Sequence, residues 1–123
     1  MKRLLLVLVL VLVFATQVYA IPMTSKLSWT QPTTTVDGQP LNVDTALTGS
    51  KIYCGKSSGT YTVTKVLAPD IIIYPVKDVP LTVGNWYCVV TSSNKYGESA
   101  YSNEKSFSID GALPNAPALE VVP

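Results

Sequence analysis

Short stretches in which apolar and polar residues alternate recur along most of the chain. This alternation is typical of half-buried β-strands, because successive side chains of a strand point to opposite faces. Turn-forming Gly, Pro, Asp and Asn residues separate the stretches. Pro75 indicates an edge strand or a bulge, since proline cannot donate a ladder hydrogen bond. The pattern predicts an all-β sandwich with strands over residues 25–30, 50–54, 61–67, 71–76, 85–93 and 102–109.

The first 20 residues have a different pattern. Two basic residues, Lys2 and Arg3, precede an unbroken apolar run from Leu4 to Ala15, and Val18 and Ala20 then fit the small pockets of signal peptidase. This layout predicts a secretory signal peptide over residues 1–20, cleaved after Ala20. An uncleaved signal anchor is the alternative. Cleavage would leave no stable membrane span, because the mature part has no apolar run of about 20 residues. We therefore expect a secreted, extracellular or cell-surface protein, with the periplasm as a further option.

The charge and composition of residues 21–123 exclude several function classes. They carry seven lysines, no arginine and eight acidic residues, so their net charge is near −1. Nucleic-acid binding depends largely on neutralising phosphates, so we expect no nucleic-acid partner. The chain has no histidine, which removes the commonest general base and metal ligand. Asp37 and Asp44 alone are weak grounds for calcium. We therefore predict no enzyme activity, no metal and no cofactor.

Several motifs along residues 26–109 carry a family resemblance. Leu27-Ser28-Trp29 comes first, then Asp37-Gly38-Gln39-Pro40-Leu41, Trp86-Tyr87-Cys88 and Gly97-Glu98-Ser99. In this order and spacing they resemble the fibronectin type III family. The resemblance implies an immunoglobulin-like β-sandwich of about six to seven antiparallel strands over residues 21–109, used for binding or as a spacer. It also implies a core signature of Trp29, Ile52, Leu81, Trp86 and Val90.

This resemblance allows the two cysteines and Trp86 to be interpreted. The strands that carry Cys54 and Cys88 are antiparallel neighbours in the implied fold, and both residues lie on apolar faces. This arrangement predicts a buried disulfide, which export would favour. Two buried thiols that fill the core are the alternative. Trp86 stands where the family has the tyrosine of its tyrosine corner, so the hydrogen bond of that corner is an open question.

The two ends of the chain depart from the family pattern. The first strand of the fold is short or missing, because only residues 21–24 precede the predicted strand at 25–30 after cleavage. Residues 110–123 form a Pro- and Ala-rich tail that resembles the start of such a strand. Its candidate donor residues are Pro117, Leu119 and Val121. An unpaired sheet edge invites strand addition, so the tail could enter the next molecule. A truncated first strand with a flexible tail, or a tail that folds back, are the alternatives.

The implied fold brings residues 33–37 and 93–96 to one pole of the sandwich, where loops often carry function. The candidate binding residues are Thr34, Asp37, Asn94, Lys95 and Tyr96. Solvated turns are the alternative interpretation. We expect a non-catalytic adhesion or binding module that acts at a cell or particle surface on a protein or glycan. The alternative function is a structural subunit that assembles with copies of itself, head to tail, by donating its C-terminal strand.

Overall fold

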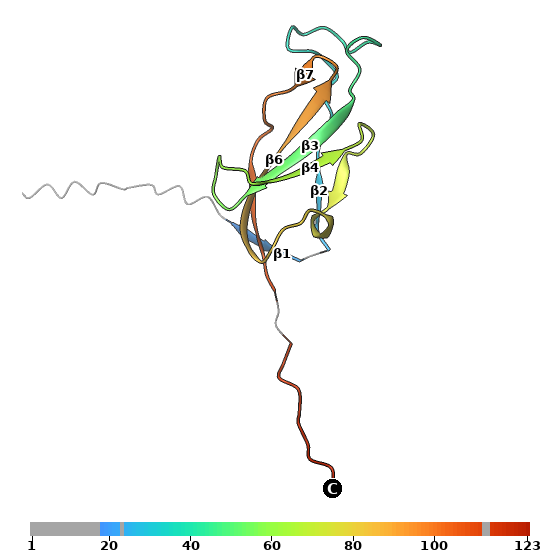
Figure 1. Ribbon diagram of the computed structural model, residues 1–123. Coiled ribbons are helices and arrows are strands. Elements are labelled where there is room, and N and C mark those ends of the chain that lie inside the picture. The colour runs from blue at the N-terminus through green and yellow to red at the C-terminus, as the bar shows by residue number, and fades with distance from the viewer. Residues whose placement is uncertain (1–17, 23, 112–113) are drawn as a thin grey trace, which may run out of the picture.

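Two β-sheets form a sandwich in the computed structural model, which describes residues 18–22, 24–111 and 114–123 (Figure 1). Within this described part, the larger sheet has the strand order β1-β8-β6-β3-β4, with β7 added beside β6, and the smaller sheet pairs β2 with β5. The predicted all-β sandwich is confirmed. The elements are β1 (Tyr19–Ile21), β2 (Lys26–Ser28), β3 (Gly49–Gly55), β4 (Val63–Leu67), β5 (Ile73–Pro75), the 3-10 helix η1 (Val76–Asp78), β6 (Gly84–Asn94), β7 (Gly97–Glu98) and β8 (Lys105–Ile109).

The larger sheet is built around the antiparallel pair of β3 and β6. Their register places Ile52 opposite Val90 and Cys54 opposite Cys88. These residues share one face, because side chains alternate along a strand, and this face covers the core. The buried core cluster consists of Ile52, Cys54, Leu67, Val76, Val79, Leu81, Trp86, Cys88, Phe107 and Ile109.

The smaller sheet covers the core less completely. β5 pairs with β2 alone among the described residues, so Pro75 lies in an edge strand, as predicted. Leu27 and Trp29 point toward the core but are only partly buried. A sheet of two strands is too narrow to cover the full width of the larger one. This leaves one margin of the sandwich thinly covered.

The first strand is present but short. β1 runs parallel to β8, with Tyr19 opposite Phe107 and Ile21 opposite Ile109. The pairing begins before the predicted cleavage point, so Tyr19 and Ala20 belong to the folded sheet in this chain. Cleavage after Ala20 stays a prediction, and residues 1–17 of the predicted leader lie outside the described part.

The predicted strand over residues 102–109 was wrong at its start, since β8 begins only at Lys105. Residues 99–104 still follow β6, but side chains take over part of the ladder. The Oγ atoms of Ser99 and Ser102 accept hydrogen bonds from the backbone N–H groups of Ser92 and Val90, both at 2.9 Å. A hydroxyl that bonds the neighbouring backbone competes with the regular strand, which explains the late start.

Candidate functional site

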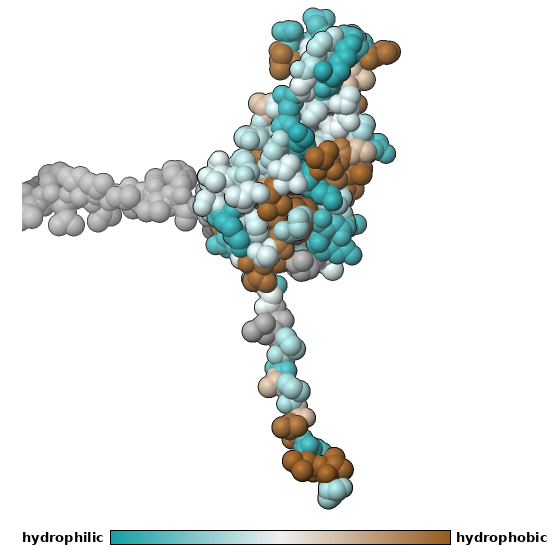
Figure 2. All heavy atoms as spheres, in the orientation of Figure 1, coloured by the Kyte–Doolittle hydropathy of each residue, from teal (hydrophilic) through white to brown (hydrophobic). Residues whose placement is uncertain are grey.

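Two loops far apart in sequence meet at the end of the sandwich where β6 turns into β7. They border an open groove with a volume of about 730 Å³. The long loop contributes Thr34, Asp37 and Asp44, and the β6–β7 turn contributes Asn94 and Tyr96. Figure 2 shows mostly hydrophilic residues at this end, with a few apolar ones among them. Hydroxyl, amide and carboxylate groups therefore line the groove together with one aromatic ring. We call it the loop groove.

The long loop begins with a small hairpin that the sequence explains. Thr34 forms a β-bridge with Pro40, and the N–H of Gly38 donates to the carbonyl of Thr35 at 2.9 Å. Gly38 has a φ of 78°, in the left-handed region that glycine enters without a steric penalty. Asp37 lies exposed at this turn. The Asp-Gly pair therefore presents the tip of the loop to solvent.

Asp44 joins the two walls of the loop groove. Its carboxylate forms an ion pair with Lys95 and accepts a hydrogen bond from the hydroxyl of Tyr96 at 2.5 Å. The hydrogen bond from Lys95 lowers the pKa of Asp44, and that from Tyr96 lowers it further. In return, Asp44 raises the pKa of Tyr96. These contacts hold the β6–β7 turn against the long loop.

Side-chain caps fix the local shape of both walls. The Oδ1 atom of Asn42 accepts hydrogen bonds from the N–H groups of Asp44 and Thr45, at 2.8 and 3.0 Å. The Oδ1 atom of Asn94 likewise accepts the N–H of Tyr96 at 2.9 Å. Such Asx turns hold a loop without a regular ladder. The groove is therefore formed by turns that carry their own local hydrogen bonds.

The structure brings the five predicted binding residues to the same end of the molecule. Thr34, Asp37, Asn94 and Tyr96 line the loop groove directly, while Lys95 contacts it through Asp44. Tyr96 is 68% exposed despite its hydrogen bond, so most of its ring is available to a ligand. Sequence reasoning missed Asp44 as the residue that links the loops. Its partners lie about fifty positions away, and local patterns do not report such contacts.

A tyrosine cluster on the outer face of the larger sheet was also missed. Tyr101 packs edge-to-face against Tyr53 and Tyr61, with ring centroids 5.4 and 5.2 Å away. The hydroxyl of Tyr53 donates to Glu98, and that of Tyr61 donates to Glu104, each at 2.5 Å. The sequence signal was the outward position of Tyr53 in its strand. These five residues, named here the tyrosine cluster, pin residues 98–104 onto β3 and the β3–β4 turn.

Each carboxylate of the tyrosine cluster is stabilised in its charged form. Hydrogen bonds from Ser58 and then Tyr61 lower the pKa of Glu104. Bonds from Tyr53 and Lys51 do the same for Glu98, and Lys51 also forms an ion pair with it at 3.0 Å. Conversely, the hydrogen bond to Glu104 raises the pKa of Tyr61 to about 12. The hydroxyls of Tyr53 and Tyr61 are both engaged within the molecule, so the cluster has the character of a structural clamp.

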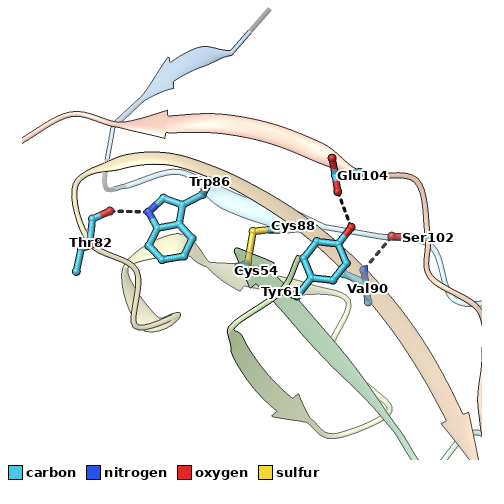
Figure 3. Close-up of a disulfide and its surroundings, with 8 residues drawn as sticks. All are labelled: Cys54, Tyr61, Thr82, Trp86, Cys88, Val90, Ser102 and Glu104. Carbon is cyan, nitrogen blue, oxygen red and sulfur yellow. Dashed lines mark hydrogen bonds between the residues drawn. A yellow bond between two sulfur atoms is a disulfide. The ribbon is translucent and has the colours of Figure 1, made fainter. Parts of the chain in front are cut away.

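The predicted disulfide is present between Cys54 and Cys88, with an S–S distance of 2.05 Å (Figure 3). It joins neighbouring strands inside the core, where both residues are buried. Trp86 lies close to it. Its Nε1–H donates to the carbonyl of Thr82 at 2.6 Å, four residues upstream. The indole therefore ties β6 to the loop that precedes it.

The other core-signature residues lie as follows. Ile52 and Leu81 belong to the buried core, while Trp29 and Val90 pack against it from partly buried positions. The Nε1 atom of Trp29 is buried and has no hydrogen-bond partner in the described part of the chain. Trp29 and Trp86 therefore differ in how their indole N–H groups are satisfied.

The C-terminal tail leaves the sandwich at the end opposite the loop groove (Figure 1). Residues 114–123 are extended and form no strand. The candidate donor residues Pro117, Leu119 and Val121 are all exposed, the latter two at 93% each. Figure 2 shows apolar residues gathered near the tip of this tail. The tail does not fold back onto its own sandwich in this structure.

The described residues contain no group of three or more Cys, Asp or Glu residues placed to hold a metal ion. No helix among residues 18–22, 24–111 and 114–123 is long and apolar enough to cross a membrane. Comparisons of the chain with protein families, with curated proteins and with solved structures found no match.

Proposed function

We propose that this protein is an exported, non-catalytic binding module of the fibronectin type III kind. It acts at a cell or particle surface and holds a protein or glycan ligand in the loop groove. The observation that carries this proposal is the convergence of residues 31–48 and 94–97 on one open groove of about 730 Å³. Turns at the ends of a sandwich are the usual place for such a site.

The chemistry of the groove fits polar ligands. Its walls offer the hydroxyl of Thr34, the amide of Asn94 and the carboxylate of Asp37. Such groups can bind the hydroxyls of a sugar or the main chain of a peptide. The exposed ring of Tyr96 and the fully exposed Val36 add apolar surface for stacking or packing. Tyrosine suits this role because it buries a large area with few rotatable bonds.

Paired substitutions of exposed tyrosines test this proposal. The labelled full chain is screened on a printed glycan array and on intact cells with defined surface proteins. Tyr96→Ala removes the ring in the loop groove, whereas Tyr101→Ala removes a ring outside it that is 56% exposed. We expect the first variant to lose binding about tenfold or more and the second to retain it. Equal binding by Tyr96→Ala and the wild type would contradict the loop groove as the site.

A second candidate function is supported by a separate observation. The tail extends away from the sandwich with Leu119, Val121 and Val122 exposed at 93%, 93% and 83%. Exposed apolar residues on an extended segment favour burial against another surface. In this alternative the protein is a structural subunit that assembles head to tail through its C-terminal strand. A chain ending at Gly111 that keeps the same solution mass as the full chain at every concentration would contradict it.

A further inference from the structure

The thinly covered margin of the sandwich contains a partly filled seam. The seam runs between β2 on one side and β8 with residues 99–102 on the other. β1 fills it beside Phe107–Ile109. Farther along, a cavity of about 230 Å³ is left between Trp29 on β2's side and Val90, Ala100 and Ser102 on the other. We call this unfilled part the open seam.

β2 ends at Ser28, directly before Trp29 in the open seam, and its backbone edge away from β5 is unpaired among the described residues. The N–H of Trp29 bonds Ile72, and the carbonyl of Ser25 accepts the N–H of Val76, both at 2.9 Å. Residues of an antiparallel strand alternate in the direction of their backbone groups. Lys26 and Ser28 therefore direct their N–H and C=O groups away from β5. In the described part of the chain β2 pairs only with β5, so this edge is available to a further strand.

The side chain of Trp29 gives a second reason to expect an occupant. Trp29 lines the open seam and is only partly buried. Apolar side chains of an occupant would cover the exposed part of this residue. An extended peptide would at the same time bond the unpaired edge of β2. The site therefore suits an extended segment that carries apolar side chains on one face.

The pattern of the C-terminal tail matches this requirement. Leu119 and Val121 alternate with Glu120, as Leu27 and Trp29 alternate with polar residues on β2. Residues 117–122 would span about 20 Å when extended, which is the length of residues 25–30 in β2 and its flanks. The charges are complementary as well: Glu120 would lie on the outer face, where the exposed Lys26 of β2 has no ion pair in the described part.

We propose that the open seam of one molecule receives residues 117–122 of a second copy. The inserted strand runs antiparallel to β2, with Leu119 and Val121 facing Trp29 and Val90. This inference rests on the second candidate function and names the acceptor that this function requires. The assembly is head to tail, because the donor surface and the acceptor surface are different parts of the chain.

Chain direction identifies the donor as another molecule. β1 and β8 run parallel, and β2 returns in the opposite direction. A strand antiparallel to β2 must therefore enter the open seam from the loop-groove end. The tail of the same molecule leaves from the opposite end. A neighbour stacked on the loop-groove end has its tail at the entrance, and repetition of this contact forms a filament.

Light scattering on the full chain tests the donor side. The chain is purified as expressed, its N-terminus is identified by mass spectrometry, and its mass is followed over about a hundredfold range of concentration. We expect the wild-type mass to rise with concentration. Val121→Asp should shift assembly to about tenfold higher concentration or more, because it places a carboxylate in an apolar seam. The matched control is Val122→Asp, which alters the outward-facing neighbour and should assemble like the wild type.

Ser28→Pro tests the acceptor side without disturbing the fold. It removes an N–H on the unpaired edge of β2, and Ser28 makes no backbone bond to β5 through that group. This variant should stay monomeric but keep a working tail. Mixed with Val121→Asp, whose seam is intact, it should give a heterodimer that grows no further. The indole N–H resonance of Trp29 should shift only in the partner that accepts the tail.

The outcomes distinguish insertion into the open seam from head-to-tail assembly through another contact. A wild-type chain that is monomeric at every concentration overturns both the seam and the head-to-tail function. Assembly that depends on Val121 but is unchanged by Ser28→Pro overturns the seam and leaves head-to-tail assembly standing. Equal effects of Val121→Asp and Val122→Asp also overturn the seam, since the inserted strand would then have no inward face. A Trp29 shift caused by Val121→Asp in a pure monomer would show that the tail enters its own seam, which contradicts the proposal.

Discussion

The two sheets of this sandwich differ in how completely their bonding is satisfied. The larger sheet has a cross-strand disulfide, a buried inner face and a clamp of tyrosines on its outer face. The smaller sheet has two strands, partly buried inner residues and an unpaired edge within the described residues. The groups that stabilise the fold and the groups that are free to bind a partner therefore lie in different sheets. Rigid pairing is concentrated in one sheet, and the other retains groups that a partner can bond.

Reduction of the disulfide should produce the largest effect on the larger sheet. The bridge closes a separation of 34 residues. In the chain-entropy account, such a loop contributes about 4 kcal/mol to the free energy of unfolding. Urea unfolding of the oxidised and reduced chain measures the difference. A Cys54→Ala/Cys88→Ala variant serves as the control, because its stability should not respond to the reductant. A loss below about 1 kcal/mol would place the main anchor of the sheet elsewhere.

The two tryptophans allow the sheets to be compared directly. Trp86→Phe removes buried volume and leaves the carbonyl of Thr82 without its donor, so we expect a loss of about 2–3 kcal/mol. Trp29→Phe removes an indole whose N–H has no partner among residues 18–22, 24–111 and 114–123, so we expect about 1 kcal/mol. The free energy of unfolding of both variants provides the measurement. Equal losses would mean that the smaller sheet is as tightly packed as the larger one.

The free energy of unfolding, measured as a function of pH in the acid range, tests the tyrosine cluster. Glu104 has a lowered pKa in the folded state, because Ser58 and Tyr61 donate hydrogen bonds to its carboxylate. Its contribution to stability is therefore present above the ordinary glutamate range and is lost as pH falls through the folded pKa. Glu104→Gln should weaken the pH dependence of the free energy of unfolding in that range.

Stability at alkaline pH tests the same clamp through Tyr61, the donor to Glu104. The pKa of Tyr61 is raised to about 12 by its bond to Glu104. A raised pKa means that the contribution is complete below the ordinary tyrosine value, near 10, and is lost as pH rises toward 12. Tyr61→Phe should remove this part of the dependence, as measured by thermal melting between these values. An unchanged alkaline slope would indicate that the hydroxyl contributes nothing to the clamp.

The smallest effect is expected at the margin between the sheets. Ser102→Ala removes the Oγ atom that accepts the N–H of Val90. We expect a loss of about 1 kcal/mol, the usual net value of one hydrogen bond. Hydrogen exchange at the amide of Val90 should become faster, while the amide of Ile52, on the neighbouring strand, should not change. Exchange that is unchanged at Val90 would show that the ladder does not need the serine there.

The sequence allowed the strands to be predicted because their signal is local. Alternation around Ile52, Cys54 and Cys88 marked both the strands and their inward face, and the structure places the disulfide on that face. The start of the last strand was misplaced, because the side chain of Ser102 replaces a backbone group there. Alternation along a segment does not show such a replacement.

The site was predicted less completely than the fold. The five loop residues came together because the implied topology placed their loops at one pole. The link through Asp44 and the clamp around Tyr101 were missed. Both depend on contacts between residues that are distant in sequence. Polar side chains on outward faces have many potential neighbours, and only the packed structure selects among them.

The position of β1 has a consequence for the predicted cleavage after Ala20. Ala20 pairs with Ser108 in the folded sheet, so the bond after Ala20 lies within a strand. Proteases cut extended, accessible backbone, and a paired strand does not offer it. If the leader is removed after Ala20, the cut must therefore come before the last strand arrives. Cleavage would then compete with the folding of the C-terminal half. Slower translocation would favour cleavage.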